Sequence, residues 1–100
     1  MNFRIKIKFR KGEEIKYISH RDMMRTFIRA IRRAKLPVAY SQGFNPHMKI
    51  SWGQALKVGQ SSPGEYAEIN LERHLHPAEL MSTLNQQLPK GLEIVEACLV

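Results

Sequence analysis

Apolar and basic residues alternate strictly at the start of the chain. The apolar members are Phe3, Ile5, Ile7 and Phe9. A period of two is typical of a β-strand with one buried face. The pattern therefore predicts a strand from Phe3 to Arg10, followed by a turn and a short returning strand over Ile15–Ile18.

The next segment has the pattern of an amphipathic helix. Ser19 and Asp22 stand three residues apart, as in a capping box, and are predicted to cap the helix start. Apolar residues then recur at helical spacing from Met23 to Ala34. Pro37 ends the helix because proline lacks the backbone N–H that a helix interior needs.

The second half of the sequence repeats this order of elements. Strands are predicted over Val38–Tyr40, Met48–Trp52, Ala67–Glu72 and Leu92–Val100, with a polar turn over Gly59–Gly64 and a second helix that begins at His76-Pro77. This order fits an α+β fold, a ferredoxin-like split β-α-β sandwich. In that fold an antiparallel sheet carries two helices on one face.

The length and the composition limit the protein class. One hundred residues, 43% of them hydrophobic, are enough for a single domain spanning residues 1–100. Because the sequence ends inside an apolar strand, we expect this domain to be the N-terminal part of a longer one.

Cysteine and histidine usage argues against metal or cofactor chemistry. Cys98 is the single cysteine, so no intrachain disulfide or cysteine cluster can form, and a reducing cytoplasmic setting is predicted. The pair His74 and His76 has no third ligand at recognisable spacing. No apolar run approaches the ~20 residues of a membrane span. We therefore predict no metal, no cofactor and no membrane partner.

The net charge of +7 is unevenly distributed. Residues 1–35 carry twelve basic and three acidic side chains, whereas residues 61–100 carry two basic and six acidic ones. Such polarity indicates an acidic partner for the first half or pairing between the halves. For the four basic residues of the first strand we prefer internal pairing. They would stand beside glutamates of the neighbouring strands.

The first predicted helix concentrates arginine on one side. The stripe consists of Arg21, Arg25, Arg29, Arg32 and Arg33. Like charges four residues apart are mildly destabilising, which favours a functional reason such as the binding of phosphates. Two alternatives stay open, namely a merely solvated face and pairing with glutamates of the second half.

The segment between the first helix and the next strand has the composition of a recognition loop. Amide, hydroxyl and aromatic groups surround a glycine, which is typical of a small polar binding site. The predicted loop site comprises Tyr40, Ser41, Gln42, Gly43, Phe44, Asn45 and Pro46, with Lys49 as a further nucleic-acid-binding residue. Turn formation alone is the other interpretation.

His20 is the one candidate for catalysis. It stands in the first helical turn, beside Asp22 and the arginine stripe. There a histidine could act as general acid or base on a bound phosphodiester. The structural alternative is a helix-start residue that contacts the neighbouring loop.

Two segments resemble a known family. They are Tyr17–Met24 (YISHRDMM) and Ala39–Pro46 (AYSQGFNP), the latter followed by Lys49–Ser51. They resemble the radical-SAM-linked domain of unknown function, which is found beside or fused to radical SAM proteins. The resemblance runs through the rest of the chain. Two departures are Arg21, where many members have leucine, and Met48, where many have a second proline.

The resemblance implies a role linked to RNA or translation and a radical SAM protein as partner in cis or in trans. It supplies no catalytic residue. With one cysteine, the chain cannot provide the three-cysteine motif of a radical SAM enzyme. Members also continue past position 100.

Three function classes follow. The first is a non-catalytic accessory domain that binds RNA through the first helix and the loop and serves a radical SAM or RNA-processing enzyme. The second is a metal-independent endoribonuclease, in which His20 is the acid–base group and Arg25, Lys49 or Tyr40 stabilises the phosphate. The third is a protein-interaction domain that docks on an acidic partner.

Overall fold

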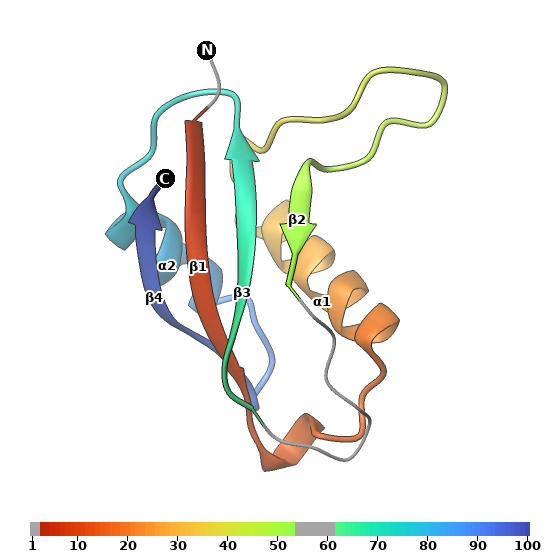
Figure 1. Ribbon diagram of the computed structural model, residues 1–100, viewed down its shortest axis with the longest axis vertical. Helices are drawn as coiled ribbons and strands as arrows, with labels where there is room; N and C mark the ends of the chain where they lie inside the picture. Colours follow the sequence, from red (N-terminus) through yellow and green to blue (C-terminus); the bar gives the residue numbers. More distant parts are fainter. Residues whose placement is uncertain (1–2, 54–61) are drawn as a thin grey trace.

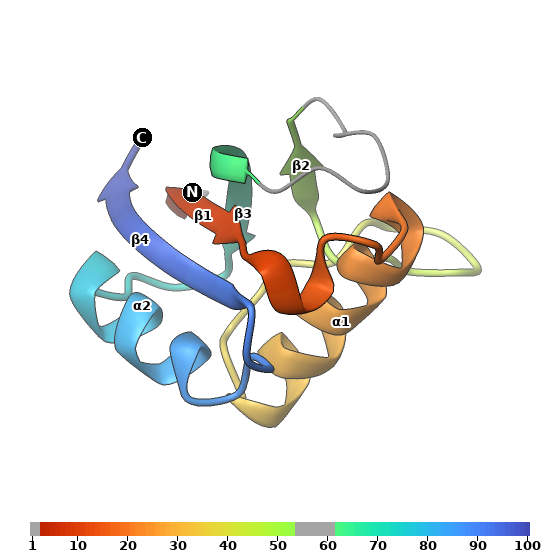
Figure 2. The same cartoon turned by 90° about the horizontal axis from the view of Figure 1, so that it is seen from below.

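A four-stranded antiparallel sheet with two helices on one face makes up the fold (Figures 1 and 2). The structure, a computed structural model, describes residues 3–53 and 62–100. In chain order the elements are β1 (Phe3–Lys11), the 3-10 helix η1 (Glu13–Ile15), α1 (His20–Arg33), β2 (Ile50–Trp52), β3 (Ser62–Leu71), α2 (Pro77–Asn85) and β4 (Leu92–Leu99). The strand order β2-β3-β1-β4 confirms the α+β ferredoxin-like prediction.

β1 lies at the centre of the sheet and organises the core. It pairs with β3 on one side and with β4 on the other. Ile5 stands opposite Ile69 and Ile7 opposite Ala67, and all four side chains face the helices and are buried. Because successive residues of a strand point to opposite faces, the four basic residues that alternate with the apolar residues of β1 lie on the open face of the sheet.

α1 begins and ends where the sequence predicts. The backbone N–H of Asp22 donates to Ser19 Oγ at 3.1 Å, which confirms Ser19 as the helix cap. Met23, Phe27, Ala30 and Ile31 form the buried stripe. After Arg33 the chain leaves the helix through Lys35, whose φ is +54°, and Pro37 prevents continuation.

Three short predictions need correction. Val38–Tyr40 is not a strand, since within the described part of the chain it forms only two isolated bridges, Val38 with Leu71 and Tyr40 with Met48. The returning strand over Ile15–Ile18 is absent: the segment takes 3-10 hydrogen bonds, and Gly12 N–H donates to Gly91 O at 2.7 Å, which turns the chain toward α1. Residues 59–61 of the polar turn predicted over Gly59–Gly64 lie outside the described residues. From Ser62 onward it belongs to β3.

α2 and β4 close the second half of the fold. His76 is the helix cap, and its Nδ1 accepts from Ala78 N–H at 3.1 Å. The side chain of Asn85 bonds both the N–H and the carbonyl of Ile94, at 2.8 and 3.0 Å. This contact fixes the end of α2 against β4.

Candidate functional site

The arginines of α1 form an exposed, positively charged surface, here called the arginine face. Its members are Arg21, Arg25, Arg29, Arg32 and Arg33, all exposed. Of these five arginines only Arg25 has an acidic group of the described residues within ion-pair distance, with its Nη1 3.8 Å from Asp22 Oδ1. Residues 1–2 and 54–64 contain no acid at all. Pairing with the glutamates of the second half, one alternative left open by the sequence, therefore does not occur here.

The basic residues of β1 are in a different situation on the open face of the sheet. Arg4 lies 3.8 Å from Glu68, and Arg10 lies 3.4 Å from Glu93. The predicted internal pairing is confirmed for these two arginines, although such exposed pairs contribute at most about 1 kcal/mol. Lys6 and Lys8 instead stand over the ring of Tyr66, at 4.7 and 5.9 Å from its centroid.

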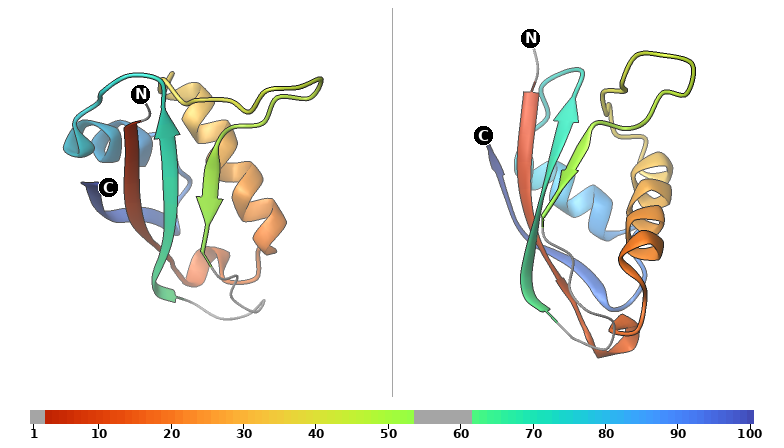
Figure 3. Two further views of the ribbon diagram at one scale, coloured as in Figure 1. Left: turned by 45° about the horizontal axis from the view of Figure 1, so that its top comes forward. Right: turned by 45° about the vertical axis from the view of Figure 1, so that its right-hand side comes forward.

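The predicted loop site forms a projecting arm, residues 40–48 (Figure 3). Tyr40 pairs with Met48 at its base. Above that pair, Ser41 N–H donates to His47 O at 2.8 Å and His47 N–H donates to Ser41 Oγ at 2.9 Å. Phe44 is fully exposed near the tip. The arm thus presents an aromatic ring to solvent on a hydrogen-bonded stem.

Gly43 and Lys49 have distinct positions in this segment. Gly43 has a φ of +125°, a conformation that residues with a Cβ rarely adopt. Lys49 follows the arm, and its N–H donates to Ala39 O at 2.8 Å. Gln42, just before Gly43, is exposed, as are Asn45 and Pro46 between Gly43 and Lys49. The predicted loop residues therefore share one projecting element.

His20 lies in a second environment, at the opposite end of α1. Its ring meets Trp52 edge-on, with centroids 6.3 Å apart. Two charged residues that face the core, Lys11 and Glu65, are only 3% and 8% exposed. Burial raises the pKa of Glu65, while the charges of Lys11 and His20 oppose that shift. His20 therefore belongs to a partly buried polar cluster with Lys11 and Glu65.

The structure places Tyr40, one of the three predicted phosphate-stabilising partners of His20, after the opposite end of α1. α1 has 14 residues and is about 21 Å long at the usual helical rise. His20 begins it, whereas Tyr40 follows its other end. Lys49 stands three residues before Trp52, whose ring meets that of His20. Arg25 stands five residues after His20 on the same helix, about 140° around its axis.

Nearly the whole chain matches one known protein family. Residues 4–100 match the family described as "Uncharacterized protein conserved in bacteria (DUF2344)". The chain belongs to this family. A search of the curated proteins found no match for it. DUF2344 membership confirms the assignment to an uncharacterised family, and the family description mentions neither RNA nor radical SAM proteins.

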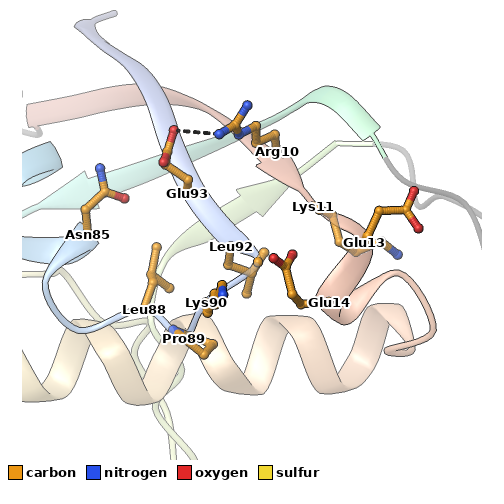
Figure 4. A pocket seen from close by; sticks show the side chains of 12 residues that line it. Arg10, Lys11, Glu13, Glu14, Asn85, Leu88, Pro89, Lys90, Leu92 and Glu93 are labelled. Carbon is orange, nitrogen blue, oxygen red and sulfur yellow. Dashed lines mark ion pairs between the residues drawn. The ribbon is translucent and has the colours of Figure 1, made fainter.

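One cavity of this DUF2344 chain is lined by none of the predicted site residues. It has a volume of about 860 Å³ and lies between η1 and the α2–β4 connection (Figure 4). Arg10, Lys11 and Lys90 line it together with Glu13, Glu14 and Glu93. Positive and negative groups are present in equal number, and the ion pair between Arg10 and Glu93 crosses its rim. The cavity therefore has no strong charge preference.

Other potential sites of the DUF2344 chain are sparse. In residues 3–53 and 62–100, no three histidine, cysteine or acidic side chains are grouped as metal ligands would be. His76 caps α2, and His74 packs edge-on against Phe3 at 5.9 Å. Within the same ranges, none of the helices combines the length and the apolarity needed to span a membrane.

We expect Glu65→Gln to raise the free energy of unfolding at neutral pH. Burial raises the pKa of Glu65, so the folded state disfavours its ionised form. The stability associated with protonated Glu65 is complete below the pKa of the unfolded chain and is lost as the pH rises through the folded pKa. The variant should therefore melt at a higher temperature than the wild type near pH 7, and the two should converge near about pH 3.5.

Thermal unfolding followed by circular dichroism across this pH range measures the effect. Glu72→Gln, at an exposed position, is the matched control and should change the melting temperature little at any pH. An unchanged melting temperature of Glu65→Gln at pH 7 would show that burial of this carboxylate carries no net cost.

Proposed function

We propose that this chain is an RNA-binding accessory domain that presents RNA to a partner enzyme, either a radical SAM protein or another RNA-processing enzyme. The observation that carries the proposal is the arginine face. Four of its five arginines have no acidic neighbour among the described residues, although the same chain pairs Arg4 and Arg10 on the sheet. Keeping unneutralised arginines on one helix favours a polyanionic ligand over solvation alone.

The arm adds a second kind of contact to the arginine face. Guanidinium groups bind phosphate oxygens in a planar, bidentate manner. The exposed rings of Phe44 and Tyr40 offer stacking surfaces for unpaired bases, an interaction of about 1–3 kcal/mol per base. The arm follows the C-terminal end of α1, so both contacts would lie on one continuous strand of RNA (Figure 3).

A salt titration tests this proposal. We expect the affinity for labelled single-stranded RNA and for transfer RNA to fall steeply as salt increases, with a slope of about −0.7 per phosphate contact for single strands. Three to five contacts correspond to a slope of about −2 to −3.5. Fluorescence anisotropy at several salt concentrations measures it. No binding at low salt, or a flat response, would exclude RNA as the ligand.

The partner enzyme is a separate question. Affinity purification of the tagged chain from its own cells, with the bound RNA and proteins identified together, tests it. Co-purification of a radical SAM protein or an RNA-processing enzyme supports the accessory role. Recovery of an acidic protein without RNA would favour the protein-docking alternative instead.

The polar cluster around His20 favours a second candidate, a metal-independent endoribonuclease. His20 would take the proton of a ribose 2′-hydroxyl as that oxygen attacks phosphorus and the bond to the 5′-oxygen breaks, and the protonated imidazole would then give this proton to the departing 5′-oxygen. The products would be a 2′,3′-cyclic phosphate and a 5′-hydroxyl, with Arg25 stabilising the phosphate. Wild type should then cut RNA in the presence of a chelator and His20→Gln should not. Equal cutting by both would rule out this role.

A further inference from the structure

We propose that a small pocket beside α1 binds a phosphate monoester, such as the terminal phosphate of an RNA or of a free nucleotide. The pocket has a volume of about 310 Å³. It is lined by Thr26, Arg29 and Arg33 of α1 and by Gln87 and Pro89 of the α2–β4 connection. As a phosphate subsite on the arginine face it rests on the proposed RNA-binding function, although its own chemistry does not require RNA.

The charge of this pocket distinguishes it from the larger cavity. Arg29 and Arg33 stand four residues apart on one face of α1, and none of the five lining residues is acidic. The described part of the chain places no acid within ion-pair distance of either arginine, and the remaining residues contain none. The large cavity, by contrast, has three acidic and three basic residues in its lining. The small pocket thus carries two uncompensated positive charges.

The other lining residues define the shape and the polarity of the pocket. Gln87 follows α2, where its backbone N–H donates to Leu84 O at 2.9 Å, and the residue contributes a side-chain amide to the pocket lining. The hydroxyl of Thr26 donates to Asp22 O at 2.9 Å, so it offers an incoming ligand an acceptor and no donor. Pro89 forms a wall that has no N–H, and Figure 4 shows it beside α1. The donors for a bound anion are therefore the two guanidiniums and one amide.

These donors match a monoester better than an internal phosphodiester. A monoester carries about −1.5 to −2 charge at neutral pH, which balances two arginines, whereas an internal phosphodiester carries one negative charge. A terminal group also leaves the pocket in one direction only, while an internal phosphate continues along the chain on both sides. The volume, near the lower end for ligand pockets, accepts a phosphate and part of the attached sugar.

Three versions of one RNA test the proposal: a 5′-phosphorylated, a 3′-phosphorylated and an unphosphorylated oligonucleotide of identical sequence. We expect one of the phosphorylated forms to bind about tenfold more tightly, because charged hydrogen bonds to two guanidiniums are gained. Arg33→Gln and Arg29→Gln should each remove most of this preference. Arg32→Gln is the matched control. It removes the same charge from the same helix outside the pocket, so it should weaken all three RNAs alike and preserve their ratio.

Titration with adenosine 5′-monophosphate, inorganic phosphate and adenosine separates the two sources of the phosphate group. Binding of the monophosphate but not of adenosine, lost in Arg33→Gln, would support the pocket with a free nucleotide as ligand, even if no RNA binds and the RNA-binding function falls. If RNA binds with a steep salt dependence but without end preference, and the monophosphate does not bind, the pocket proposal is overturned and the RNA-binding function stands. A preference that survives in both Arg29→Gln and Arg33→Gln would also overturn it.

Discussion

Phe27→Ala is expected to lower the free energy of unfolding by about 3–5 kcal/mol, the usual cost of deleting a fully buried phenyl ring. Phe27 has no exposed surface, and its ring lies 4.8 Å from that of Phe9 and 5.4 Å from that of Trp52. It therefore joins α1 to β1 and β2 at one point. The loss of aromatic contacts adds to the cavity that the shorter side chain leaves.

Urea and thermal denaturation followed by circular dichroism measure this loss. The free energy of unfolding of a domain of this size is about 5–15 kcal/mol in total. The melting temperature of the variant should therefore fall by at least about 12 °C. Phe44→Ala is the matched control, because its ring is fully exposed on the arm and its removal should change stability by less than about 0.5 kcal/mol. Equal effects of the two substitutions would mean that Phe27 does not pack in the core.

The double variant Arg25→Glu with Arg29→Glu should lower RNA affinity by about 100-fold or more at low salt. Each lost charge-assisted hydrogen bond to phosphate contributes about 1.5–3 kcal/mol, and each new carboxylate repels the backbone. The salt slope should become shallower in proportion to the lost contacts. Fluorescence anisotropy with the same RNA measures both quantities.

The matched control for this variant is Arg73→Glu with Lys90→Glu. It changes the net charge by the same amount, at two exposed positions that are not on α1. We expect it to reduce affinity far less than the helix variant does. A similar loss in both variants would indicate a diffuse electrostatic attraction, and unchanged affinity in the helix variant would exclude the arginine face.

The strand and helix patterns of the sequence predicted the architecture because each repeats a simple period. The inward-facing positions of β1, from Phe3 to Phe9, continue with Lys11. Those of β3, Ile69 and Ala67, continue toward the start of that strand with Glu65. Extending the first strand by one residue and the other by two would have placed both charges on the core side. The sequence-based prediction ended the first strand at Arg10 and began the other at Ala67, and so left out Lys11 and Glu65.

Other features depend on contacts between residues far apart in the sequence. The segment Ile15–Ile18 has the composition of a strand but turns because Gly12 bonds to Gly91. The proposed phosphate pocket brings together Arg33, the last residue of α1, and Gln87, which lies in the connection between α2 and β4. No local pattern relates these positions, so only the packed structure brings them together.

The central position of β1 has a consequence for biosynthesis. β1 is synthesised before its neighbours β3 and β4, which begin only at residues 62 and 92. Because protein synthesis adds about 5–20 residues per second, several seconds pass before both partner strands exist. During that time the apolar side of β1 has no strand to pair with. Because every β1 pairing is long-range, the sheet forms late and folds slowly for its size. The basic residues between the apolar ones keep this waiting segment charged, which protects the nascent chain from aggregation.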